Sequence, residues 1–142
     1  MAMLVMFVCQ ANVGRSQVAE AYFERLSRHE VCSSGLRVDE SMARNKPASN
    51  KLKDNSQHSL PYMLERGVDI SEKERTQITP DLVAAADRIV AILPTEEVPA
   101  FLAESGKLTV WDLPDPVDHP NAAWAIFDEI GERIQALVAE IG

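Results

Sequence analysis

Short hydrophobic runs alternate along the chain with segments whose apolar residues recur at helical spacing. The first run, Leu4–Val8, contains no polar residue, which is typical of a central parallel strand covered on both faces. Three further segments have the length and composition of strands, namely 31–34, 88–93 and 108–111. The sequence therefore predicts a sheet of four strands.

Helix signals fill most of the intervals between these strands. Apolar residues recur at helical spacing after Ser16, whose hydroxyl we expect to cap that helix. Proline or threonine at the start and glycine at the end indicate shorter helices further along. The remaining predicted helices run from Ser59 to Gly67, from Thr79 to Ala86, from Thr95 to near Gly106, and from Ala122 to Ile141. We expect Thr79 to cap the second of these, with Pro80 at its first position.

The order of these elements predicts the fold class. Strands separated by helices argue for a parallel α/β sheet with right-handed crossovers. A chain of 142 residues is long enough to bury a hydrophobic core, and we expect a single domain over 1–142. Residues 37–59 are polar and show no sustained period, so we expect a loop, or a loop with short helical turns, there.

Composition and charge narrow the class of partners. Hydrophobic residues make up 46% of the chain and charged residues 25%, with a formal net charge of −8. An acidic surface disfavours nucleic acids and anionic membranes, and no apolar run is long enough to span a bilayer. The apolar start is too short for a signal peptide. With two cysteines and no sign of a disulfide scaffold, we expect a cytoplasmic protein that binds neither nucleic acid nor membrane.

A cysteine ends the first predicted strand, and an arginine and a serine open the helix that follows. The free N–H groups of such a loop and the positive end of the helix dipole suit an oxyanion such as phosphate. The N–H groups and Arg15 would favour the thiolate form of Cys9. The planar guanidinium of Arg15 can also hydrogen-bond two oxygens of the anion at once. Asn12 and Gly14 tolerate the positive φ that lets a loop curl round an anion. The sequence thus predicts a nucleophilic loop whose substrate-binding residues are Gln10, Ala11, Asn12, Val13, Gly14, Arg15 and Ser16.

Five blocks of sequence carry a resemblance to a known family. Residues 8–16, followed by Ala19-Glu20, are similar to the opening of the low-molecular-weight protein tyrosine phosphatases and of the arsenate reductases that share their fold. Further blocks match in order along nearly the whole chain: Ser33-Ser34-Gly35, Gly67-Val68-Asp69-Ile70-Ser71, Ala86-Asp87-Arg88-Ile89-Val90 and Asp115-Pro116. The resemblance implies a flavodoxin-like α/β fold, a three-layer sandwich around a central four-stranded parallel sheet.

The resemblance also implies an activity, the hydrolysis of phosphate monoesters through a phosphocysteine on Cys9. The substrate would be protein phosphotyrosine or an aryl phosphate, so the partner is a phosphorylated protein or a small phosphate ester. Loop N–H groups and Arg15 would stabilise the developing charge, and Asp115 would protonate the leaving oxygen and later activate water. Asp112 and Asp118 lie nearby, but the family's acid precedes a proline, as Asp115 does.

Three polar residues are expected to support this machinery. Ser16 can hydrogen-bond the sulfur of Cys9 and help it to leave, and Asn12 is expected to hold the shape of the loop. The resemblance alone implies that Ser34, on the second strand, contacts Asn12 and holds it in place. The three histidines lack ligand-like spacing, so the sequence indicates no metal site, and the chemistry requires no cofactor.

Two alternatives to a phosphatase remain open at this point. The same loop would accept arsenate, and Gln17 and Trp111 look more like residues of the reductases than of the phosphatases. Thioredoxin-linked reductases of the family carry two more cysteines after the third strand, whereas this chain has none between Leu82 and Thr109. Arsenate reduction would therefore need an external small thiol or a glutaredoxin-like partner. The other alternative is a module that senses an oxyanion without turnover.

Overall fold

Four parallel strands form the central sheet of the computed structural model, which describes residues 2–142. They are β1 (Leu4–Cys9), β2 (Glu30–Gly35), β3 (Arg88–Ile92) and β4 (Leu108–Trp111). The order β2-β1-β3-β4 places β1 in the interior, where it pairs with β2 on one side and β3 on the other. This is the flavodoxin-like order, and the predicted four-stranded parallel sheet is confirmed.

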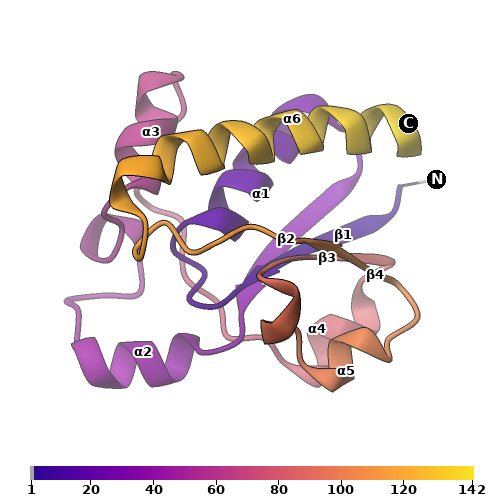
Figure 1. Ribbon diagram of the computed structural model, residues 1–142, viewed down its shortest axis with the longest axis horizontal. Coiled ribbons are helices and arrows are strands. Elements are labelled where there is room, and N and C mark those ends of the chain that lie inside the picture. The colour runs from indigo at the N-terminus through magenta and orange to yellow at the C-terminus, as the bar shows by residue number, and fades with distance from the viewer. Residues whose placement is uncertain (1) are drawn as a thin grey trace.

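Helices cover both faces of the sheet and make the three layers (Figure 1). On one side lie α1 (Arg15–Leu26), α3 (Ser59–Glu65) and α6 (Ala123–Ile141); on the other lie α4 (Pro80–Ala85) and α5 (Ala100–Ala103). Successive side chains of a strand point to opposite faces. Accordingly, Val5 and Phe7 of β1 belong to the core under α1 and α6, whereas Met6 and Val8 belong to the core under α4 and α5.

The helix predictions hold with two corrections. Helix α1 begins at Arg15, so Ser16 lies inside the helix and is not its cap. The helix predicted from Thr95 consists of two short pieces, η2 (Thr95–Glu97) and α5, because Pro99 between them cannot donate a helical hydrogen bond. The cap predicted at Thr79 is confirmed, since its side chain accepts a hydrogen bond from the Leu82 N–H group. Among residues 2–142, no helix is long and apolar enough to cross a membrane.

The segment 37–59 is more helical than the sequence predicts. It contains α2 (Val38–Asn45) and the short helix η1 (Leu52–Asp54). Only Val38 and Ser41 of α2 are buried, so the helix has no apolar stripe to reveal it. Its end also lacks a glycine signal, because Lys46 itself adopts the left-handed conformation, with φ of 46°.

The carboxyl ends of the strands form one edge of the sheet, and this edge positions the site. The loop 10–14 follows β1 there, and the segment 112–119 follows β4 and leads through η3 (Pro120–Ala122) into α6. Ligands of open α/β sheets bind beyond this edge. Two segments about a hundred residues apart are therefore brought to one place by strand order alone.

Gly35, at the end of β2, packs closely against the backbone of the loop 10–14. A Cβ atom on Gly35 would lie 2.8 Å from the backbone nitrogen of Asn12 and 2.8 Å from the backbone oxygen of Gln10. We predict that Gly35→Ala lowers the free energy of unfolding by about 1–3 kcal/mol, because backbone would have to shift. Urea denaturation measures this. Gly14→Ala is the matched control, since its Cβ would meet the Phe127 ring at an ordinary 3.6 Å; equal losses in both variants would contradict the prediction.

Candidate active site

Cys9 lies at the end of β1, against the first turn of α1. Its side chain is 2% exposed, and its Sγ atom is 3.0 Å from the Ser16 hydroxyl oxygen. No side chain in the described part of the chain caps α1, so the N–H groups of its first turn are left to bind an anion next to the sulfur. The cysteine therefore lies beside the positive end of the helix.

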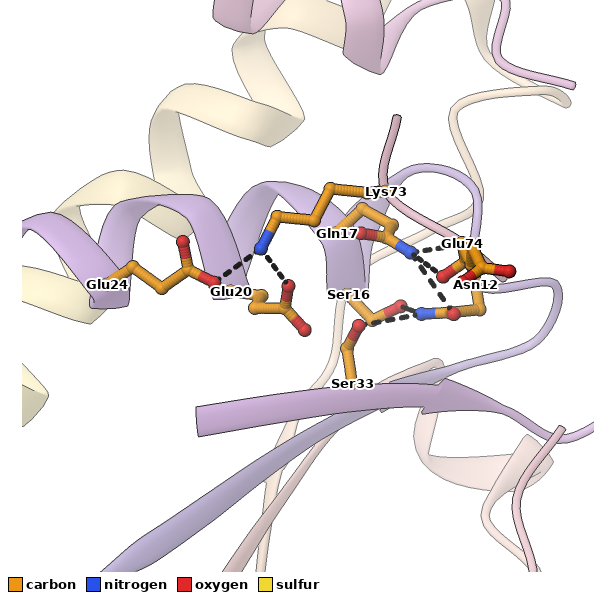
Figure 2. A network of polar contacts seen from close by, with 8 residues as sticks. All are labelled: Asn12, Ser16, Gln17, Glu20, Glu24, Ser33, Lys73 and Glu74. Carbon is orange, nitrogen blue, oxygen red and sulfur yellow. Dashed lines mark hydrogen bonds and ion pairs between the residues drawn. The ribbon is translucent and has the colours of Figure 1, made fainter. Parts of the chain in front are cut away.

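The loop 10–14 is held in shape by the buried amide of Asn12 (Figure 2). Its nitrogen donates to the hydroxyls of Ser16, at 2.7 Å, and Ser33, at 3.0 Å. Its oxygen accepts from the backbone N–H of Thr76 at 2.8 Å and from the Gln17 amide at 3.2 Å. Asn12 has the positive φ that its sequence position suggested, 54°. Four hydrogen bonds thus fix the residue on which the curl of the loop turns.

The contact with Asn12 that we expected from Ser34 is made by Ser33. The Ser33 hydroxyl accepts from Asn12, whereas the Ser34 hydroxyl donates to the sulfur of Met6 at 3.4 Å. Alternation along β2 is the reason. Ser33 pairs in register with Phe7 and shares its α1 side of the sheet, so Ser34 points to the opposite layer.

Other loop residues depart from the expectation in smaller ways. Gly14 has φ of −113°, so the positive φ predicted for it is wrong. The Gln10 side chain donates to Glu97 at 2.8 Å and turns away from Cys9. Asn12 and Ser16 are fully buried. Of the predicted substrate-binding residues, Asn12 and Ser16 offer an anion only their backbone, since their side chains are engaged in the contacts above.

Arg15 joins the loop after β1 to the segment after β4. Its guanidinium is 2% exposed, donates to the backbone oxygen of Leu113 at 3.0 Å and lies 3.6 Å from a carboxylate oxygen of Asp115. The other Asp115 oxygen accepts from the Val117 N–H at 3.0 Å. Asp112, its rival in the sequence, instead accepts a hydrogen bond from the Thr95 hydroxyl. The structure therefore brings Asp115, and not Asp112, to the arginine beside Cys9.

A cavity of about 440 Å³ opens over these groups. Cys9, Arg15 and Asp115 all line it, together with parts of the segment 37–59. This segment thus borders the mouth of the site. The lining also includes polar residues such as Asn45, Asp54 and Gln57, and apolar, aromatic or basic residues, namely Val13, Arg44, Pro47, His58, Val117 and Phe127.

Polar residues behind the loop form contacts that the sequence did not predict, although Gln17 and Glu20 belong to the stretches that resemble the family. Gln17 is buried and donates to the Glu74 backbone oxygen at 3.1 Å as well as to Asn12. Lys73 forms ion pairs with Glu20, at 2.9 Å, and with Glu24 (Figure 2). Burial opposes protonation of Lys73, but its hydrogen bonds to the two glutamates outweigh this and raise its pKa. These contacts fasten the segment 73–76 to α1, which keeps Thr76 against Asn12.

Comparisons with known proteins agree with this fold. The family model described as low molecular weight phosphotyrosine protein phosphatase matches residues 4–142. An arsenate reductase of Bacillus licheniformis is 30% identical, over 97% of this chain and 96% of that protein. The structure of Vibrio vulnificus Wzb in complex with benzylphosphonate is similar, with a TM-score of 0.77 at 21% identity, over 99% of this chain and 100% of that one. The YwlE arginine phosphatase from Geobacillus stearothermophilus gives a TM-score of 0.77 at 22% identity, over 98% and 92%.

The two adjacent serines of β2 provide a test of the loop geometry. We predict that Ser33→Ala lowers the free energy of unfolding by about 1 kcal/mol, because the Asn12 amide loses an acceptor, and that it weakens the binding of inorganic phosphate. Ser34→Ala should have the smaller effect on phosphate, since thioether sulfur is a weak acceptor on the far side of the sheet. Urea denaturation and titration calorimetry measure the two quantities. A larger loss of phosphate affinity in Ser34→Ala would refute this assignment.

Proposed function

This chain belongs to the low molecular weight phosphotyrosine protein phosphatase family, and on that premise we propose that it hydrolyses phosphate monoesters, with protein phosphotyrosine or an aryl phosphate as substrate. The observation that carries the proposal is the single cavity lined by Cys9, Arg15 and Asp115. A nucleophile, an anion-binding fork and an acid from distant parts of the chain face one volume. Phe127 and His58 at the same cavity suit an aromatic leaving group.

In the first step the Cys9 thiolate attacks phosphorus. A sulfur–phosphorus bond forms while the bond from phosphorus to the leaving oxygen breaks. The N–H groups of the loop and of the first turn of α1, with the Arg15 guanidinium, hold the non-bridging oxygens. Asp115 gives its proton to the leaving oxygen, so that the product departs as an alcohol or phenol.

In the second step a water molecule attacks the phosphocysteine. The ionised Asp115 takes a proton from this water, and the sulfur–phosphorus bond breaks to release inorganic phosphate. The electron pair returns to Cys9 as thiolate. The Ser16 hydroxyl, 3.0 Å from the sulfur, can donate a hydrogen bond to that thiolate and so makes it a better leaving group.

Variants of Cys9 and Asp115 test the two roles on different substrates. We predict that Cys9→Ser abolishes turnover of p-nitrophenyl phosphate. Asp115→Asn should lower kcat for phenyl phosphate by about a hundredfold or more, because phenolate needs the proton of the acid. The loss for p-nitrophenyl phosphate should be smaller, since p-nitrophenolate leaves without it. Initial rates for both esters give the comparison.

Asp112→Asn is the control for this pair of substrates, because Asp112 lies in the same segment but bonds to Thr95. It should leave both rates close to those of the unaltered protein. An Asp115→Asn variant with the same loss on both esters would show that Asp115 does not protonate the leaving group. Full turnover in Cys9→Ser would end the proposal.

Arsenate reduction is the second candidate, favoured by the 30% identity to the Bacillus licheniformis reductase. Attack of Cys9 on arsenate would form a sulfur–arsenic bond as an arsenic–oxygen bond breaks and water leaves. A second thiol would then attack the Cys9 sulfur, so that the sulfur–arsenic bond breaks, its electron pair reduces arsenic to arsenite, and the two sulfurs end as a disulfide. Cys32 is poorly suited to this, because burial and the charge of Glu20 raise its pKa to about 11. Its thiol therefore stays protonated at neutral pH.

We predict that arsenite forms only when an external thiol such as glutathione with a glutaredoxin is supplied. Cys32→Ala should then leave the rate unchanged. Arsenite production coupled to NADPH oxidation measures this, with Cys9→Ser as the blank. Arsenite formed by the protein alone in a single turnover, and lost in Cys32→Ala, would contradict the prediction and assign a reductase role to Cys32.

A further inference from the structure

Arg75 brings a second buried guanidinium to the cavity of Cys9. It lies in the segment between α3 and α4, is 5% exposed and lines the cavity together with Arg15. Nothing in its sequence surroundings marks it, since it follows a run of alternating charges. Arginine is rarely fully buried unless it is paired with a negative charge. The burial of Arg75 therefore has to be explained by such a partner.

The contacts of Arg75 bind three segments together. Its Nε–H donates to the backbone oxygen of Ala11 in the loop, at 3.0 Å. One terminal nitrogen donates to the Asn55 side-chain oxygen, at 2.8 Å, and the other to the Ser41 hydroxyl of α2, at 3.0 Å. The guanidinium therefore links the oxyanion loop directly to the two short helices that border the mouth.

All of these acceptors are neutral. Within residues 2–142, no carboxylate forms an ion pair with Arg75, whereas Arg15 lies 3.6 Å from Asp115 and Arg66 lies 3.1 Å from Asp128. A guanidinium does not lose its proton in proteins, and a buried charge is costly without a counter-ion. Burial lowers the pKa of Arg75, and the charge of Cys9 opposes that shift.

We propose that Arg75 is a second fixed positive charge of the oxyanion site, with the Cys9 thiolate as its counter-ion in the free protein and the bound oxyanion as its counter-ion afterwards. It acts as a positioning residue, because the group it touches is the Ala11 carbonyl and not the reacting atoms. The proposal rests on Cys9 as the reacting group of the proposed function. It does not depend on whether phosphate esters or arsenate are turned over.

Other charged groups around the cavity do not replace Arg75. Arg15 is paired with the Asp115 carboxylate, and Arg44 is exposed and lies 3.8 Å from a carboxylate oxygen of Glu40. The remaining titratable groups that face the cavity are Asp54, which accepts from the Ser49 hydroxyl, and His58. Among the arginines that line the cavity with Cys9, Arg75 is therefore the buried one that has no carboxylate partner in the described chain.

The pH dependence of Cys9 alkylation by iodoacetamide tests the proposal without any substrate. Mass spectrometry of the Cys9 peptide, in a Cys32→Ala background, reads the midpoint. Arg75→Gln keeps hydrogen-bond donors but removes the charge, and it should move the midpoint to higher pH by about one unit. Arg75→Lys keeps the charge and should move it much less. Arg66→Gln, which removes a guanidinium outside the cavity, is the control and should leave it in place.

Inorganic phosphate supplies the second readout. We expect Arg75→Gln to weaken its binding about tenfold and Arg75→Lys to weaken it less, as judged by calorimetry. Should Arg75→Gln fail to fold, Asn55→Asp places a carboxylate against the guanidinium and should also move the alkylation midpoint upward. An unchanged midpoint in a folded Arg75→Gln or in Asn55→Asp would overturn the proposal, as would equal shifts in Arg75→Gln and Arg75→Lys. If the midpoint shifts as expected but the protein shows no phosphatase turnover, that result counts against the proposed function alone.

Discussion

The left-handed backbone of Asn12 is the constraint on which the site depends. A loop that leaves a buried strand and enters a helix within five residues must turn its N–H groups inward to bind an anion. Asn12 makes that turn with φ of 54° and is held there by hydrogen bonds to α1, to β2 and to the segment 73–76. A side chain without both donor and acceptor could not satisfy these partners, so the amide is matched to its surroundings on both sides.

The sheet supplies the second requirement, which is rigidity beneath the nucleophile. The strand that ends in Cys9 is central, and residues 5–9 are buried on both faces. Its position is therefore fixed by packing rather than by the loop. Arg15 then fixes the position of the segment that holds Asp115, because its guanidinium donates to the Leu113 carbonyl. Asp115, the proposed acid, is more exposed than Arg15, and its placement depends on its contact with Arg15, the proposed anion-binding residue.

Much of the fold follows from the sequence because strand and helix signals were local. The four strands, the Thr79 cap and the last helix are each specified by a few neighbouring residues. Cys9 and Arg15 could be proposed from residue type and spacing, and Asp115 from the family resemblance, and the structure places all three at one cavity. Helix α2 was missed because it buries only Val38 and Ser41 and ends without glycine.

The remaining errors concern side chains whose roles depend on direction or on distant contacts. Ser33 and Ser34 look alike in sequence. Because side chains alternate between the two faces along β2, the hydrogen bond from Asn12 goes to Ser33 and not to Ser34. Arg75 gains its place from packing against α2 and the loop, which no local pattern records. The central claim is that Cys9 carries the phosphoryl group during turnover. Rapid quenching of the protein with an aryl phosphate, followed by mass spectrometry, tests it most directly: the account predicts one phosphoryl group on the Cys9 peptide that forms before steady-state turnover. Turnover with no phosphorylated Cys9 at any quench time would contradict it.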